Sequence, residues 1–241
     1  MLLKKIHRFA NPNKFLKVIY PFKKISLYMA VFLLFIGLMD ALLFSPPDYQ
    51  QSQTVRIMYI HVPSAWVSLL AYIMIFFFSL MYIIWKFPLF ILIAKEIPII
   101  GISFTLITLV TGSLWGKPTW GTYWVWDARL TSFLVLLFIY MGLIFLEKAF
   151  KFSNNGDISF AYISIIGAIN IPVIKFSVDW WNTLHQPASV FRLDGPTISA
   201  EMLIPLIIMS LGILFLFFFL ALTNVESAIQ EKKINSQNFR G

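Results

Sequence analysis

The 241-residue sequence contains no cysteine and few charged residues. Without thiols, the chain itself can form no disulfide, no thiolate metal site and no C-x-x-C-H motif, so any thiol chemistry must belong to a partner. Charged residues make up only 12% of the chain, whereas hydrophobic residues make up 59%. This is too little polar surface to cover a soluble globule, and the composition therefore indicates an integral membrane protein.

Six stretches are nearly free of charge, and each is about 20 residues long, which is the length of a helix that crosses the hydrocarbon core of a bilayer. Lipid-exposed loops are excluded, because their backbone polar groups would have no hydrogen-bond partners. The predicted fold class is an all-α membrane bundle that forms one domain over residues 1–241. The predicted helices lie near residues 25–44, 63–85, 97–115, 129–147, 158–176 and 199–222.

The positions of the basic residues predict the orientation of the bundle. Fourteen of the 19 Lys and Arg residues lie in the two terminal tails and in the loops after the second and fourth helices. The positive-inside rule places this side, with both termini, in the cytoplasm. Topology and anionic lipid headgroups explain the net charge of +8, so we expect membrane lipid and no nucleic acid as a partner. The outer loops are predicted near 45–62, 116–128 and 177–198.

Two of the three histidines lie in outer loops beside helix ends. His61 directly precedes the second helix, His185 follows the fifth, and His7 belongs to the basic tail. A single interfacial histidine is usually only a satisfied polar residue. Two imidazoles at equal depth, without Cys or an Asp/Glu-x-x-His pattern, favour a bis-His haem over a tetrahedral zinc site. A short interfacial helix is predicted before His61, with one apolar face formed by Val55, Met58, Ile60 and Val62.

Tryptophan is concentrated on the outer face. An aromatic belt usually places one or two Trp at a helix end, but six of the eight Trp lie on this face, and a large flat apolar ligand would account for them. Gly116, Pro118 and Gly121 predict that the loop 116–128 is irregular and presents its rings. The six outer tryptophans are Trp115, Trp120, Trp124, Trp126, Trp180 and Trp181.

Several polar residues are predicted to support such a ligand. Asp127 is expected to cap the fourth helix and to pair with Arg129. Haem carries two propionates, and arginine suits planar bidentate recognition of carboxylates. Threonines along one face of the third helix are expected to hydrogen-bond to neighbouring helices. The outer cations available for the propionates are Arg56, Lys117, Arg129 and Arg192, and the threonines are Thr105, Thr108 and Thr111.

Three motifs carry a family resemblance. The segment WGTYWVWDARLT at 120–131 resembles the tryptophan-rich (WWD) signature of the haem-handling proteins of cytochrome c biogenesis. HVPSAW at 61–66 and WWNTLHQP at 180–187 are similar to segments of cytochrome c maturation protein C, also called haem exporter protein C. The resemblance spans about residues 25–222.

The resemblance implies a protein of a bacterial or a mitochondrial inner membrane that is not an enzyme, and the short basic N-terminus favours the bacterial membrane. It implies a non-covalent b-type haem at the periplasmic face, bound to iron through His61 and His185 and delivered to the haem chaperone, protein E. A single-helix protein D would support the complex, and the ABC transporter proteins A and B would release the loaded chaperone. The other residues expected at the haem are Trp115, Trp120, Trp124, Trp126, Asp127, Arg56 and Arg129.

Other readings of the sequence stay open. A cytochrome c haem lyase or synthase subunit shares the tryptophan-rich motif, although those proteins look larger and carry additional His. A transmembrane haem transporter would move haem through the bundle, but the predicted helices contain no His and few charges to line a path. A structural anchor with interfacial Trp and His explains each residue alone better than the whole set.

Overall fold

The computed structural model describes residues 12–150, 153, 155–185 and 189–238. Within these ranges the chain is helical, and its one strand-like feature is an isolated bridge between Asp48 and Ser52. The elements in chain order are α2 (Pro12–Leu43), η1 (Gln53–Ile57), α3 (Met58–Trp85), α4 (Pro88–Glu96), α5 (Pro98–Trp120), α6 (Ala128–Ala149), α7 (Gly156–Gly167), α8 (Asn170–Trp180) and α9 (Ala200–Asn238).

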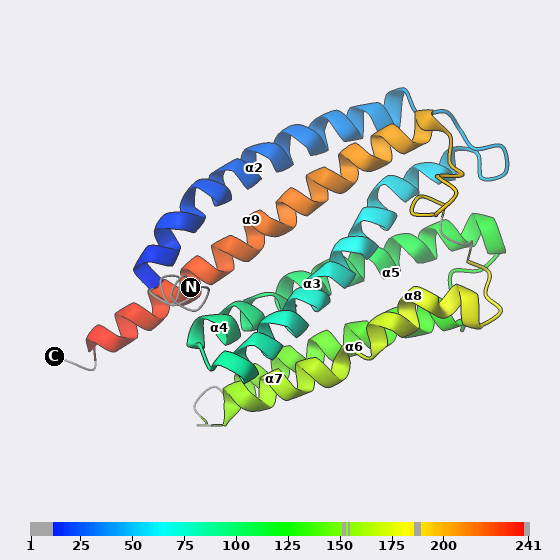
Figure 1. The fold of residues 1–241 in the computed structure, drawn as a ribbon. Coiled ribbons are helices and arrows are strands. Elements are labelled where there is room, and N and C mark those ends of the chain that lie inside the picture. Colours follow the sequence, from blue (N-terminus) through cyan, green and yellow to red (C-terminus); the bar gives the residue numbers. More distant parts are fainter. Residues whose placement is uncertain (1–11, 151–152, 154, 186–188, 239–241) are drawn as a thin grey trace.

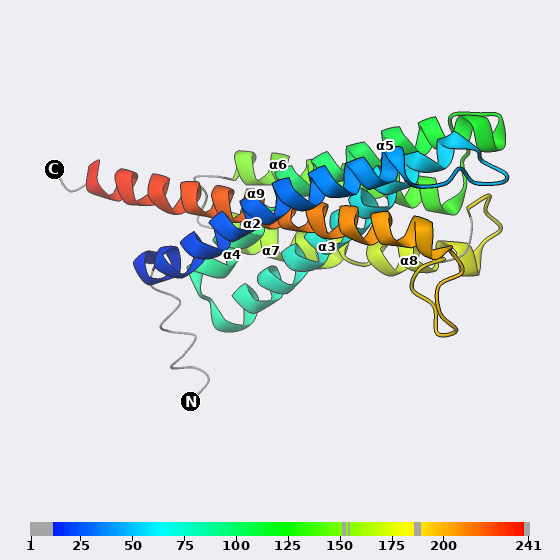
Figure 2. The ribbon, with the colours of Figure 1, turned by 90° about the horizontal axis from the view of Figure 1, so that it is seen from above.

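Six helical segments are long and apolar enough to cross a membrane, which confirms the predicted fold class. The segments are α2, η1 with α3, α4 with α5, α6, α7 with α8, and α9. They form an elongated bundle in which α2 packs along α9 (Figures 1 and 2). Because the number of crossings is even, α2 begins and α9 ends at the same end of the bundle (Figure 1).

Two helices are longer than predicted at that end. α2 begins at Pro12, a residue suited to a first helical turn, instead of near residue 25. α9 continues to Asn238 instead of ending near residue 222, because no Gly or Pro interrupts residues 223–238. The extension of α9 is held by packing, since Val225 and Ile229 are buried against Leu92 of α4.

The fifth crossing is broken, whereas one helix over 158–176 was predicted. α7 ends at Gly167, and α8 begins at Asn170. Pro172 has no N–H to donate to the carbonyl of Ala168, four residues earlier, so a continuous helix would lose that hydrogen bond. Ile171 N donates to Ala168 O instead, at 3.0 Å.

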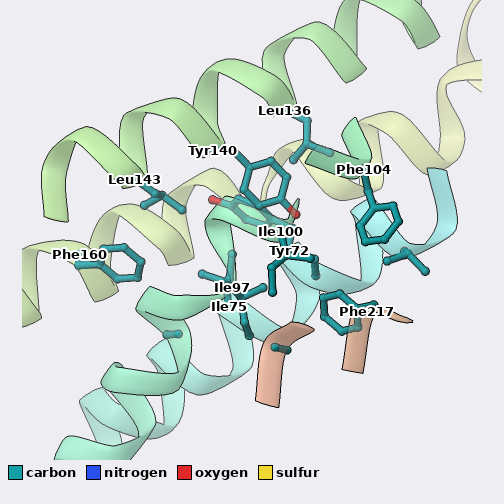
Figure 3. Packing of buried hydrophobic residues seen from close by; sticks show 14 of the residues in the cluster. Tyr72, Ile75, Ile97, Ile100, Phe104, Leu136, Tyr140, Leu143, Phe160 and Phe217 are labelled. Atoms are coloured by element: carbon teal, nitrogen blue, oxygen red, sulfur yellow. The ribbon is translucent and has the colours of Figure 1, made fainter. Parts of the chain in front are cut away.

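Large side chains fill the middle of the bundle. Figure 3 shows Tyr72 of α3 and Tyr140 of α6 among apolar residues of several helices. Both rings are fully buried and pack edge to face, with centroids 5.3 Å apart. Their hydroxyls donate to backbone oxygens, Tyr72 to Ser164 O and Tyr140 to Ser68 O. The middle of the bundle is therefore filled by packed side chains, and the candidate site residues lie at the helix ends.

Candidate functional site

The predicted ligands gather at the end of the bundle opposite the start of α2. The first turns of α3 and α6 and the last turns of α5 and α8 meet there (Figure 1). His61 belongs to the first turn of α3, Arg129 to the first turn of α6, and His185 to the segment after α8. Residues far apart in the chain therefore share one site.

His61 was predicted in an outer loop, but the structure places it in a helix. η1 leads directly into α3, which starts at Met58, five residues before the predicted boundary at residue 63. Of the residues predicted for the interfacial helix, only Val55 belongs to η1, where it is buried. A helical position fixes the backbone of His61.

The ring of His61 packs against α5. Its Nδ1 lies 3.1 Å from Oγ1 of Thr111, and its ring meets that of Trp115 edge to face at 5.6 Å. A Cβ atom at Gly112 would lie 2.9 Å from Cε1 of His61. Glycine at position 112 is therefore what allows the imidazole to approach the helix so closely.

The ring of His185 is held by Asp127. Its Nδ1 lies 2.8 Å from Oδ2 of Asp127, and Thr183 donates its hydroxyl proton to the same carboxylate oxygen. The hydroxyl of Thr183 also accepts the backbone N–H of His185 at 3.1 Å. Trp120 packs edge to face on this imidazole, with centroids 4.8 Å apart. The arrangement mirrors that at His61, because each ring has a polar partner at Nδ1 and a tryptophan beside it.

Both histidines line one small cavity. Its volume is about 40 Å³, and Arg129 forms part of its wall. Because both rings are hydrogen-bonded through Nδ1, their Nε2 atoms remain to bind a metal. The remaining lining residues are Thr108, Leu109, Gly112, Leu130 and Phe133.

Asp127 caps α6 as predicted, but its other contact is a hydrogen bond with His185 and not an ion pair with Arg129. Its Oδ1 accepts the N–H of Leu130 at 2.8 Å, while Arg129 donates through Nε to Oγ of Ser177 at 3.1 Å. Within the described chain, the basic side chain within 4 Å of the Asp127 carboxylate is His185, at 2.8 Å. The predicted Asp127–Arg129 pair is thus replaced by contacts that join α6 to α8 and to the following segment.

Burial and hydrogen bonding set the charges of this pair. Burial alone raises the pKa of Asp127, but hydrogen bonds from Thr183, Leu130 N and His185 outweigh it and lower the pKa below its usual value. Burial lowers the pKa of His185, against the opposing effect of Asp127. At neutral pH, Asp127 is therefore a carboxylate and His185 a neutral imidazole, the form that binds metals.

The tryptophan-rich stretch is less irregular than predicted. α5 continues through Gly116 and Pro118 to Trp120, and residues 121–127 connect it to α6. The ring of Trp120 lies over Gly116, where a Cβ atom would be 2.9 Å from the ring, and this packing favours the last turn. Gly121 ends the helix with φ 78°, a left-handed conformation that suits glycine.

The tryptophans occupy different environments. Trp115 donates Nε1 to Oε1 of Gln51 at 2.7 Å and is anchored. Trp124 and Trp126 meet edge to face at 5.4 Å, and Trp126 is 75% exposed. Trp180 stacks on Phe176, with ring centroids 5.2 Å apart. Trp126 is therefore the ring most available to a ligand or partner.

The structure separates the four candidate outer cations. Arg129 lines the histidine cavity, whereas Arg56 donates to Ser45 O at 3.3 Å. Lys117 donates to Gly121 O at 3.0 Å, and Arg192 forms an exposed pair with Asp194. Of these four cations, Arg129 is the one that lines the cavity between the histidines.

Some site residues were not singled out from the sequence. Gly112, Thr183 and Gln51 all contact a predicted site residue. Thr111 had been assigned only to helix packing, and it does bond across helices, but its partner is His61. The sequence signal for a site role of Thr111 was its position on α5, one helical turn before Trp115.

Comparison with known proteins places this chain in a family. The family model described as Heme exporter protein C matches residues 5–240. The Heme exporter protein C of Bradyrhizobium diazoefficiens is 45% identical, over 94% of this chain and 86% of the relative. The Heme exporter protein C of Escherichia coli strain K12 is 42% identical, over 76% of this chain and 75% of the relative.

A relative from a plant extends the similarity beyond bacteria. The putative cytochrome c biosynthesis ccmC-like mitochondrial protein of Marchantia polymorpha is 51% identical, over 71% of this chain and 72% of the relative. The range matched by the family model, residues 5–240, includes both histidine segments and the tryptophan-rich stretch. The chain therefore belongs to the Heme exporter protein C family, multi-pass membrane proteins with a role in haem handling for cytochrome c biogenesis.

Proposed function

We propose that the protein binds haem at the outer, periplasmic face of the membrane through Nε2 of His61 and Nε2 of His185. It then delivers the haem to the periplasmic haem chaperone, protein E. The observation that carries this proposal is that both rings line one cavity and are held through Nδ1. Metal-binding imidazoles are commonly oriented by a partner on the other ring nitrogen.

The donor set fits a haem iron better than a bare ion. Among the described residues, no three His, Asp or Glu side chains are grouped so that they could hold a metal ion. Two neutral imidazoles are instead a common pair of axial ligands for haem iron, whose porphyrin supplies the other four nitrogens. The haem would be bound non-covalently, as a b-type haem.

Haem entry requires the site to open. Pockets for ligands of drug size or larger have volumes of roughly 300–1,000 Å³, but the cavity between the histidines has only about 40 Å³. The stretches 121–127 and 181–185 are free of regular helix, and they contain Asp127, Thr183 and His185 of the site. We infer that these segments separate to admit the porphyrin, and that Trp124 and Trp126 then cover part of it.

Two arginines are suited to the propionates. Arg129 lines the cavity and can reach a carboxylate there. Nε of Arg56 is buried and has no hydrogen-bond partner within the described residues. A buried donor without a partner is costly, and a propionate would supply the missing acceptor.

The proposed complex resides in the bacterial inner membrane. The single-helix protein D supports it there, and the ABC transporter proteins A and B release the loaded chaperone. The covalent bond to haem belongs to protein E, so this chain delivers haem without catalysing a reaction of its own. A haem lyase or synthase subunit, the main alternative, would instead join haem to apocytochrome thiols.

A transmembrane haem transporter is the other alternative. Haem would then have to pass through the middle of the bundle, but Tyr72, Tyr140 and Phe217 are fully buried there. A packed core gives a porphyrin no passage without large rearrangement. This packing favours handling at one face.

The test is the haem spectrum of the protein purified with proteins D and E. We expect a low-spin six-coordinate haem that becomes high-spin or is lost in His61→Ala and in His185→Ala. His7→Ala is the matched control, because it removes the third histidine, in the terminal tail, and should leave the spectrum unchanged. If both site variants keep the wild-type spectrum and still load the chaperone, the ligand assignment is wrong. Haem attached to apocytochrome without protein E would favour the lyase.

A further inference from the structure

We propose that the two histidines are unequal iron ligands, with His185 the stronger one that is kept to the last and His61 the weaker one that is released first. The inequality comes from the residues behind the rings, Asp127 at His185 and Thr111 at His61. These are positioning residues, because each acts through a histidine. The inference rests on the proposed haem site and adds an order of release to it.

Thr111 fixes which nitrogen of His61 carries the proton. Its hydroxyl has one proton, and Oγ1 lies 2.6 Å from the carbonyl oxygen of Ile107, an atom that can only accept. With its proton committed to Ile107 O, Oγ1 accepts from Nδ1 of His61 at 3.1 Å. His61 is therefore the Nδ1–H tautomer, with its lone pair on Nε2.

Asp127 fixes His185 in the same tautomer. Its carboxylate receives three hydrogen bonds, from Leu130 N, the Thr183 hydroxyl and Nδ1 of His185. An ionised carboxylate only accepts, so the proton lies on Nδ1 of His185. Both rings thus offer Nε2, although their supports differ in charge.

The difference in charge decides which ring binds iron more strongly. A carboxylate behind an imidazole raises the basicity of the ring and so strengthens its bond to a metal. Hydrogen bonds to an ionised acceptor are also about twice as strong as those between neutral groups. The Thr111 hydroxyl is neutral and already donates to Ile107 O, so it withdraws little proton density from His61.

Release then begins at His61. When the bond between iron and Nε2 of His61 breaks, its electron pair stays on Nε2, and no proton has to move because Nδ1 already holds the ring proton. His185 would then be the remaining protein ligand, and the side of the haem that His61 had occupied would be open. An incoming ligand from a partner can take that position while the haem is still held.

The first experiment measures the two bonds separately. Ferrous haem b is bound to His61→Gly, which keeps His185, and to His185→Gly, which keeps His61. Resonance Raman spectroscopy then gives the iron–histidine stretching frequency of each five-coordinate complex. We expect a clearly higher frequency in His61→Gly, because its remaining ligand is backed by a carboxylate.

The second experiment removes the support and keeps the ligand. Asn retains one side-chain oxygen that can cap α6, but its amide nitrogen only donates. With the cap kept, Asp127→Asn therefore removes both the charge and the acceptor that face Nδ1 of His185. Placed in the His61→Gly background, it should lower the stretching frequency to that of His185→Gly and weaken haem binding about 10- to 100-fold. Thr111→Val in the His185→Gly background should leave the frequency almost unchanged.

A third measurement needs no haem. Nitrogen-15 NMR of histidine-labelled apoprotein should show the Nδ1–H tautomer at both rings, and Thr111→Val should mix the tautomers of His61 only. Equal stretching frequencies in the two glycine variants would overturn this inference and leave the haem site standing. A wild-type protein that binds no low-spin haem would instead refute the proposed function itself, so the two failures are distinguishable.

Discussion

Asp127 and His185 are 58 residues apart in the chain, yet Oδ2 of Asp127 lies 2.8 Å from Nδ1 of His185. The other carboxylate oxygen caps the first turn of α6 through Leu130 N. One side chain therefore fixes both the start of a membrane helix and the orientation of a proposed ligand. Stability and ligand geometry are coupled at this residue.

Asp127→Ala should lower stability more than Asp127→Asn. Alanine removes the cap, which costs about 0.5–2 kcal/mol of the free energy of unfolding, whereas asparagine retains it. Thermal unfolding of the two variants in detergent measures the difference. Equal melting temperatures would show that the cap contributes nothing.

Gly112→Ala should displace His61. The new methyl would lie 2.9 Å from Cε1 of the ring, closer than non-bonded carbon atoms approach, so the imidazole must move. We expect loss of the low-spin haem spectrum with a retained fold. Gly142→Ala on α6 is the matched control, because a Cβ atom there meets nothing within 4 Å.

As the pH falls, folded His185 should take up a proton at a lower pH than an ordinary histidine does. Burial lowers its pKa below 6.5, so the unfolded chain takes up a proton first as the pH falls from about 6.5. The free energy of unfolding therefore decreases between that pH and the lowered pKa of the folded state. NMR titration of the apoprotein checks this, and a His185 that titrates at or above 6.5 would contradict it.

The lowered pKa of Asp127 acts in the opposite sense. It contributes stability that is fully present above about pH 3.8, the ordinary carboxyl value, and is lost as the pH falls through the folded-state pKa. Asp127→Asn should therefore flatten the acid limb of the stability profile. An unchanged limb would mean that other carboxylates dominate it.

Tyr140→Phe should weaken the packed centre by about 0.5–1.5 kcal/mol, the net contribution of one hydrogen bond. The variant leaves Ser68 O without the donor that lies 2.7 Å away. Tyr162→Phe is the matched control, since Tyr162 is 52% exposed and should change the free energy of unfolding little. Denaturant or thermal unfolding compares the two.

Trp126→Ala should reduce chaperone loading and leave the fold intact. Its ring is 75% exposed beside the site, so its removal creates no core cavity but takes away a surface for the porphyrin. Trp85→Ala, at the opposite end of α3, is the control. Unchanged loading of protein E by Trp126→Ala would exclude a role for this ring.

The sequence predicted the features that depend on local pattern. Charge-free stretches indicated the crossings, and Asp127 directly before Ala128 indicated a helix cap, which the Oδ1 contact to Leu130 N confirms. The polar partners of His61 and His185 were beyond reach, because Thr111 is 50 residues from His61 and Asp127 is 58 from His185. Such contacts depend on how the helices pack.

The predicted helix boundaries were wrong where side-chain packing opposes the local helix propensity. Gly116 and Pro118 predicted a loop, but Trp120 packs over Gly116 and α5 continues. The break between α7 and α8 had a signal in Pro172 that hydropathy alone does not register. Both corrections concern the site. Trp120 lies in the continued part of α5, and His185 follows α8, the second half of the broken crossing.

The position of both histidines at helix ends has an electrical consequence. Moving one elementary charge across the full bilayer changes its free energy by about 2.3 kcal/mol when the membrane potential is 100 mV. His61 lies in the first turn of α3, and His185 follows the end of α8, so cargo held between them crosses almost none of that field. Transfer to a partner at this face should therefore proceed equally well in energised and in depolarised membranes.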